Sequence, residues 1–324
     1  MTMKKLLDTV LLLALPASGK SEVRKYMAQL SPKSCAEDFH MGPTVQLDDF
    51  PYVHVMRRID DELEKRSAPR QFFQSGDKPF KNPKDWGTLI ALLNEDYADL
   101  LQKKTHDPSS AALHMLKRID AASLAVGAPA RLSSFDSATL NAITDSLEKE
   151  CRELLVEKNQ NTQVDLQGKT IVIEFARGGK HGSSLPLEAP FGYLYSLGQL
   201  SPEILAKARI LYIWVTPEES RRKNHERTDP NDPGSILHHG VPIEVMMNEY
   251  GCDDMEWLES HSTVPGTVAI NAKGKQYQLP IARFDNRVDK TSFIRKDRKD
   301  WAPAEVAAIH DGLRSALEKL ASFG

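Results

Sequence analysis

The sequence has few cysteines and no excess of charge of one sign. Its 324 residues include Cys35, Cys151 and Cys252, which are far apart and show no paired spacing. An odd number of scattered thiols argues against a disulfide framework or a zinc site and favours a reducing environment. Lys and Arg total 42 against 45 Asp and Glu, whereas nucleic-acid coats and membrane-surface proteins are far more basic. We therefore expect a soluble, globular, cytoplasmic protein whose partner is neither a membrane nor a nucleic acid.

The sequence also lacks a long apolar run at its N-terminus. Asp8 interrupts the first apolar segment, and the uninterrupted part covers only residues 10–15. A membrane-spanning helix needs about 20 apolar residues. The segment resembles a secretory signal, because two lysines precede it and small residues follow it. A buried parallel strand gives the same run, since both of its faces are covered, and the residues that follow favour the strand.

A loop of small residues containing Gly-Lys-Ser follows this strand and precedes a helical pattern. The loop residues are Pro16, Ala17, Ser18, Gly19, Lys20 and Ser21, followed by Glu22. In a phosphate-binding loop, glycine lets the backbone approach the phosphates and successive N–H groups surround them. The lysine reaches the terminal phosphates, the serine hydroxyl binds Mg²⁺, and the helix N-terminus adds partial positive charge. Ala14 stands where the pattern has its first glycine, so an ordinary strand-to-helix turn is the alternative.

These residues, Leu15 to Ser21, resemble the P-loop kinases that phosphorylate nucleosides, nucleotides, sugars and other small metabolites. The resemblance is to a superfamily and covers the core strands and their loops. It implies an ATP-binding α/β core with a mobile lid and an inserted acceptor region, and it implies ATP and Mg²⁺ as cofactors. Residues 16–22 would then bind the nucleotide, and Ser21 would be a metal ligand.

Apolar strands alternate with helices along the rest of the chain. Strands are expected at residues 44–47, 170–175 and 209–215, and a hairpin at 267–282. A C-terminal helix is expected from Pro303, because apolar residues from Val306 to Leu320 form one stripe. This alternation predicts an α/β fold with a doubly wound, mostly parallel sheet in three layers, α/β/α. Either strand of the hairpin could join the parallel sheet.

About 120 residues separate the second and third strands, too many for a crossover loop. They contain apolar helical faces at residues 86–101 and 140–155, a shorter apolar stripe at 55–63 and a long loop at 72–83. We therefore expect a core at residues 1–50 and 165–324, with a lid at about 217–240, and a helical insertion at 51–164. The resemblance implies that the insertion binds the phosphoryl acceptor, and a helical cover over the sheet is the alternative.

Polar residues follow the predicted strands where ligands of open α/β sheets bind. In similar small-molecule kinases an aspartate at the position of Asp48 or Asp49 accepts the proton of the acceptor hydroxyl or orients Mg²⁺, and Glu174 would hold Mg²⁺ and contact the acceptor. As the resemblance implies, Arg177 would bind the acceptor, and Arg57 and Asp49 are further acceptor-binding candidates. The alternatives are a capping turn at the two aspartates and a salt bridge at the sheet edge.

A basic helix follows the fourth strand and resembles the lid of nucleotide and nucleoside kinases. Its Arg222 and Arg227 would stabilise the transferring phosphoryl group, although a surface helix can be basic for solubility alone. Farther on, residues 283–299 are rich in basic side chains. His238 and His239 lack partners at ligand spacing, so no metal site is expected there.

The sequence as a whole predicts an ATP- and Mg²⁺-dependent phosphotransferase acting on a small metabolite, such as a nucleoside or nucleotide. An ATP-binding regulatory or switch protein is the alternative, and the absence of an Asn-Lys-x-Asp motif argues against a GTPase. A polynucleotide-end kinase is a further alternative, which only the basic tract supports.

Overall fold

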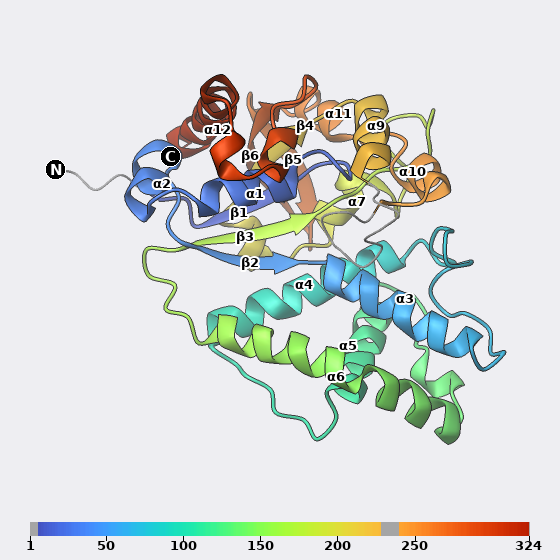
Figure 1. The fold of residues 1–324 in the computed structure, drawn as a ribbon. Helices are drawn as coiled ribbons and strands as arrows, with labels where there is room; N and C mark the ends of the chain where they lie inside the picture. The colour runs from blue at the N-terminus through green and yellow to red at the C-terminus, as the bar shows by residue number, and fades with distance from the viewer. Residues whose placement is uncertain (1–5, 228–239, 324) are drawn as a thin grey trace.

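The computed structural model describes residues 6–227 and 240–323 and has a six-stranded sheet at its centre (Figure 1). The strand order is β2-β3-β1-β4-β6-β5. The strands are β1 (Thr9–Leu13), β2 (Thr44–Asp48), β3 (Thr170–Phe175), β4 (Ala208–Trp214), β5 (Thr267–Ala272) and β6 (Lys275–Asp285). Only β5 runs antiparallel, at one edge, so β6 is the hairpin strand that joins the parallel sheet. The prediction of a mostly parallel α/β sheet is confirmed.

Helices cover both faces of the sheet. Val10 and Leu12 of β1 pack with α1 (Lys20–Ala28), α2 (Pro32–Phe39) and α12 (Pro303–Ser322). Leu11 and Leu13 pack on the opposite face with α7 (Gly192–Gly198), α8 (Pro202–Leu205) and α11 (Met255–Ser260). Successive strand side chains point to opposite faces, so a central strand between two helical layers must be apolar throughout. The arrangement is compatible with a three-layer α/β/α fold.

Four helices lie between β2 and β3, on the side of the molecule away from α12 (Figure 1). They are α3 (Phe50–Glu64), α4 (Asp85–Gln102), α5 (Ala111–Ala125) and α6 (Ser137–Thr162). They share an apolar cluster with the loop that precedes α4. Sequence reasoning located helices over parts of α3, α4 and α6 but did not identify α5.

Helix α4 belongs to two apolar cores. Ile90 and Leu93 pack on the sheet, whereas Leu89 and Leu92 pack among α3, α5 and α6. The expectation of one apolar face over residues 86–101 is therefore wrong, and Leu101 is exposed. A helix wedged between a sheet and a helical group is buried nearly all round, which removes the polar face of a surface helix.

The other helices surround the carboxyl edge of the sheet. Helix α9 (Pro217–Arg227) follows β4, and α10 (Ile243–Glu249) lies between α9 and α11. Short 3₁₀ turns occur at η1 (Leu132–Ser134), η2 (Ser292–Arg295) and η3 (Arg298–Asp300). Residues 228–239, about half of the expected lid, and with them His238 and His239, lie outside the described residues. None of the helices in the described ranges combines the length and apolarity needed to cross a bilayer.

Candidate active site

The topology places the switch point of the sheet at the carboxyl ends of β1 and β3. Helix α1 follows β1 on one face of the sheet, and α7 and α8 follow β3 on the other. The two strands are neighbours, so their connections leave in opposite directions. Ligands of open α/β sheets bind at such a switch point. The loop with Gly-Lys-Ser starts from this point.

Residues 14–19, here called the glycine loop, join β1 to α1 in a tight conformation. Ala17 has φ 54° and Gly19 has φ 105°, both in the left-handed region. A Cβ at position 19 would lie 2.5 Å from the Thr291 hydroxyl oxygen, so only glycine fits without displacing a neighbour. Left-handed residues in sequence turn backbone N–H groups toward a common concavity, which suits an anion.

Lys20 is the first residue of α1 and is largely buried, with 9% of its surface exposed. Its Nζ lies 3.5 Å from the Leu15 carbonyl oxygen, so the side chain folds back along the glycine loop. Burial raises the pKa of the Asp49 carboxyl, and the positive charge of Lys20 opposes that rise. Ser21 follows it and is half-buried at the N-terminus of α1, where the helix dipole favours an anion.

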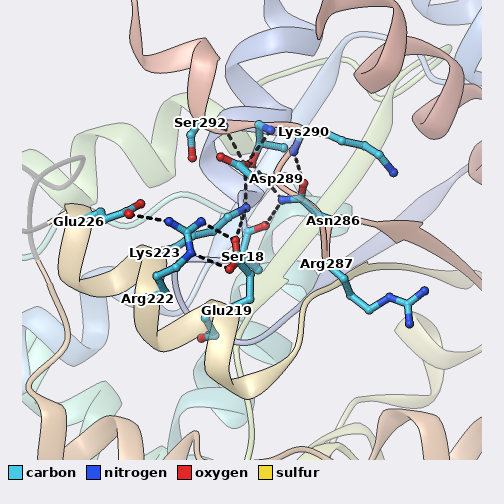
Figure 2. Close-up of polar contacts among 12 residues, drawn as sticks. Ser18, Glu219, Arg222, Lys223, Glu226, Asn286, Arg287, Asp289, Lys290 and Ser292 are labelled. Carbon is cyan, nitrogen blue, oxygen red and sulfur yellow. Dashed lines mark hydrogen bonds and ion pairs between the residues drawn. The ribbon is translucent and has the colours of Figure 1, made fainter.

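Two segments far apart in the sequence brace the glycine loop. Ser220 of α9 donates a hydrogen bond to the Pro16 carbonyl oxygen at 2.7 Å. The Asn286 amide, which is fully buried, donates to the Ser18 carbonyl oxygen at 2.7 Å. The Ser18 hydroxyl is buried without a hydrogen-bond partner among the described residues. Figure 2 shows Ser18 between α9 and the segment at 286–292.

Three carboxylates, on Asp48, Asp49 and Glu174, lie at the carboxyl ends of β2 and β3. Asp48 and Glu174 are register partners on β2 and β3, and Glu174 also pairs with Leu12 of β1. Arg24 of α1 contacts both acids, with its Nη1 at 2.8 Å from Glu174 and 3.7 Å from Asp48. Burial, followed by repulsion from Glu174 and Asp49, raises the pKa of Asp48 to about 7. The cluster is therefore short of positive charge.

Carboxylate and hydroxyl oxygens are the ligands that Mg²⁺ prefers in proteins. Glu174 and Asp48 supply such oxygens at the carboxyl ends of β3 and β2, where Arg24 contacts both of them, so a divalent cation would have to take the place of Arg24. Of the predicted ligands, Glu174 thus offers a carboxylate with Asp48 beside it, and Ser21 offers its hydroxyl from the N-terminus of α1. Arg24, which sequence reasoning missed, lies one helical turn after Lys20 and so on the same face of α1.

Asp49 and Arg177 form a buried ion pair. The distance from Arg177 Nη1 to Asp49 Oδ2 is 2.6 Å, and Nη1 also donates to the carbonyl oxygen of Ala176. The Nε of Arg177 donates to Ser196, and the guanidinium lies over the Trp86 ring at 4.8 Å. Burial raises the pKa of Asp49, and Arg177 opposes that shift. With 1% of its surface exposed, Arg177 holds Asp49 in place rather than presenting its guanidinium to an acceptor.

Arg57 of α3 lies away from the glycine loop. Its guanidinium stacks on Phe73 at 4.0 Å and donates to the Gly76 carbonyl oxygen at 2.8 Å. Burial lowers the pKa of Arg57, whereas Tyr250 and Glu249 oppose that shift. Burial raises the pKa of Glu249, at the end of α10, to about 7. No sequence motif surrounds Glu249, and sequence reasoning did not select it.

The predicted lid arginine Arg222 is bound by acids of its own helix. It is paired with Glu219 and Glu226 of its own helix, and 47% of its side chain is exposed (Figure 2). The side chain of Arg227 lies outside the described residues. Glu22, predicted to bind the nucleotide, is paired with Arg295 at 2.8 Å on the flank of α1.

Lys223 is the basic residue of α9 that faces the core. It is 1% exposed, and its Nζ lies 2.8 Å from Asp289 Oδ1, in the segment that braces the glycine loop (Figure 2). Lys223 holds the pKa of Asp289 well below its usual range, although burial opposes this. Ser220, Lys223 and Asn224 are all buried at helical spacing, a signal that could have distinguished Lys223 from Arg222.

A second acidic cluster lies in the helical region, where ligand atoms of Glu95, Asp99 and His106 lie within 4.8 Å of one another. Arg118 contacts Glu95 at 3.0 Å and Lys158 contacts Asp99 at 2.6 Å. A metal ion would have to displace both cations, so this cluster is an ion-pair network between helices.

The site therefore combines a glycine loop with a helix N-terminus, a buried lysine and a group of carboxylates at one sheet edge. This arrangement can bind phosphate groups and a divalent cation side by side. Comparison of the chain with protein-family models, with curated proteins and with solved structures gives no match.

Proposed function

We propose that this protein is an ATP- and Mg²⁺-dependent phosphotransferase of the P-loop kinase type, acting on a small metabolite. The observation that carries the proposal is the position of Asp48, Asp49 and Glu174 beside the glycine loop and Lys20. Phosphoryl transfer requires positioning and charge stabilisation more than covalent chemistry, and these groups supply both.

Each group has a role in this reaction. The glycine loop and Lys20 bind the donor phosphates, and Ser21, Asp48 and Glu174 hold Mg²⁺, which neutralises charge on the phosphates. Asp49, oriented by Arg177, accepts the proton of the acceptor hydroxyl. Lys223 stands on α9 beside the segment that braces the glycine loop, and the helical region between β2 and β3 contributes Arg57 to the acceptor site.

A small acceptor fits the surface charges better than a polynucleotide. In the basic tract, Arg283 is paired with Glu259 at 2.6 Å and Arg287 with Asp285 at 2.8 Å. Arg295 is paired with Glu22. Basic side chains that are already neutralised by acids release few counterions, which removes most of the affinity for a nucleic-acid backbone.

The proposal is tested by ATP binding and by phosphoryl transfer in the Lys20→Ala variant. The matched control is Lys25→Ala, an exposed lysine on the same helix. Wild type and Lys25→Ala should be stabilised by ATP–Mg²⁺ in thermal unfolding and should release ADP with one class in a panel of small acceptors. Lys20→Ala should lose both responses while unfolding normally without ATP. Equal ATP turnover in all three proteins would contradict the proposal, and ATP binding without transfer to any acceptor would favour a switch protein.

A further inference from the structure

We infer that the acceptor is a hydroxyl compound that carries no phosphate or carboxylate group. This inference rests on the proposed kinase function and names the substrate class of that site. It follows from the charges on the acceptor side, defined here as Arg24, Asp48, Asp49, Arg57, Glu174, Arg177 and Glu249.

The arginines at the strand ends are already neutralised by acids of this chain. Arg177 is bound to Asp49 at 2.6 Å and is 1% exposed, and its remaining donors contact Ser196 and a backbone carbonyl. Arg24 contacts Glu174 at 2.8 Å and Asp48 at 3.7 Å. An acceptor phosphate is normally held by an arginine fork that can turn to it, and neither guanidinium offers one.

The strand ends carry more acid than base. Three carboxylates, on Asp48, Asp49 and Glu174, face the two guanidiniums of Arg24 and Arg177. Lys20 adds a third positive charge, but its position along the glycine loop directs it to the donor phosphates. A phosphorylated acceptor would add between one and two negative charges to this group. A neutral or amine-bearing acceptor adds none.

Arg57, the remaining cation of the acceptor side, is held away from the carboxylates. It lies against Phe73 and Glu249, and it donates to the Gly76 carbonyl oxygen. When it is ionised, Glu249, which is 4% exposed, supplies the opposite charge for Arg57 within the protein. An anionic acceptor would have to replace Glu249 as the partner of Arg57.

The acceptor side does offer a neutral donor. Trp86 is 5% exposed, and its indole Nε1 has no full hydrogen bond within the described part of the chain, although it lies beside Glu249. Its ring contacts the Arg177 guanidinium that orients Asp49. Beside Glu249, the indole N–H can also donate to the oxygen of a hydroxyl compound.

The test compares matched acceptors that differ by one anionic group, using the full chain with ATP–Mg²⁺ and measuring ADP release. The pairs are adenosine and adenosine 3′-phosphate, ribose and ribose 1-phosphate, and 2-aminoethanol and serine, so that both members of each pair keep the same free primary hydroxyl. The inference expects at least tenfold higher kcat/KM for the unsubstituted member of whichever pair reacts. Preference for the phosphorylated or carboxylated member would overturn the inference and leave the kinase function standing. If ATP binds and no acceptor in a wider panel of hydroxyl compounds reacts, both the kinase function and the inference fail.

A second test compares the ratio of kcat/KM values for two acceptors in a charge variant, and this ratio does not depend on the absolute rate. Asp48→Asn removes one negative charge and keeps the oxygen that accepts from the Phe50 N–H. The selectivity ratio between the two members of the reactive pair should fall several-fold in Asp48→Asn. The control Asp145→Asn, an exposed residue of α6, should leave that ratio unchanged. An unchanged ratio in Asp48→Asn would show that these charges do not set the choice of acceptor.

Discussion

The two sides of the carboxyl edge are built in different ways. The donor side is formed by one contiguous stretch, residues 14–21, whose backbone does most of the work and whose charged group is Lys20. The acceptor side draws its charged groups from α1, α3, α10 and the ends of β2 and β3. Those groups neutralise one another. In the proposed function, the phosphate site thus lies within one short motif, whereas the acceptor site is assembled by packing.

The largest expected effect comes from breaking the buried pair on the acceptor side. Arg177→Ala should lower the free energy of unfolding by about 3–5 kcal/mol, because it leaves the Asp49 carboxylate buried without its partner. The double variant Arg177→Met, Asp49→Asn should recover a substantial part of that loss. Urea unfolding measures both. Equal losses in the two proteins would mean that Arg177 stabilises by packing alone.

A pH dependence of the free energy of unfolding should also arise on the acceptor side, from Glu249. The pKa of Glu249 is raised to about 7 by burial, so between its unfolded and folded pKa the native state binds more protons than the unfolded state. The contribution of protonated Glu249 to the free energy of unfolding is complete below about pH 4.3 and is lost as the pH rises through 7. Relative to Glu249→Gln, the wild type should lose on the order of 3 kcal/mol across this window.

This prediction is checked by urea unfolding of wild type and Glu249→Gln at several pH values from 4.5 to 8. Glu157→Gln, at an exposed position on α6, is the matched control and should follow the wild-type profile. If the profiles of wild type and Glu249→Gln are parallel, Glu249 does not titrate in this range.

On the donor side, backbone geometry should matter more than charge pairing. Gly19→Ala places a Cβ at φ 105° and 2.5 Å from the Thr291 hydroxyl, and should cost about 2 kcal/mol together with ATP affinity. Gly274→Ala, at φ 77° with open space around it, isolates the backbone effect and should cost about 1 kcal/mol. Thermal unfolding with and without ATP–Mg²⁺ measures both quantities. Loss of ATP binding in Gly274→Ala as well would show that the effect is not local.

The smallest change in the free energy of unfolding is expected for a variant on α9. There, Arg222 and its neighbour Lys223 should differ in their effects. Arg222→Ala should change the free energy of unfolding by less than about 0.5 kcal/mol, because its ion pairs are exposed. Lys223→Met keeps the apolar stem but removes the charge beside Asp289, and should lower kcat more than Arg222→Ala does. Steady-state kinetics at saturating ATP decide between them. A larger loss of kcat in Arg222→Ala would restore the lid role predicted for that residue.

Several elements could be predicted because local pattern decides them. The apolar segments that became β1, β3 and β4 lie between two helical layers, and a strand covered on both faces has to be apolar. Pro303 marks the first position of α12. Helix α4 was misread, because a helix between two cores has no polar face by which its orientation can be predicted.

The positions of the glycine loop and of the carboxylates at the ends of β2 and β3 could be predicted from the sequence. The loop depends on neighbouring residues, and the carboxylates follow the rule that parallel strands end at one edge of the sheet. Only the tertiary structure decided which charges meet. Arg177 is paired with Asp49, Arg24 with Glu174 and Lys223 with Asp289, while Arg222 faces solvent. The two members of each of these three ion pairs are separated by between 66 and 150 residues in the sequence. Ion pairing depends on distance and burial in space, and no local pattern encodes either.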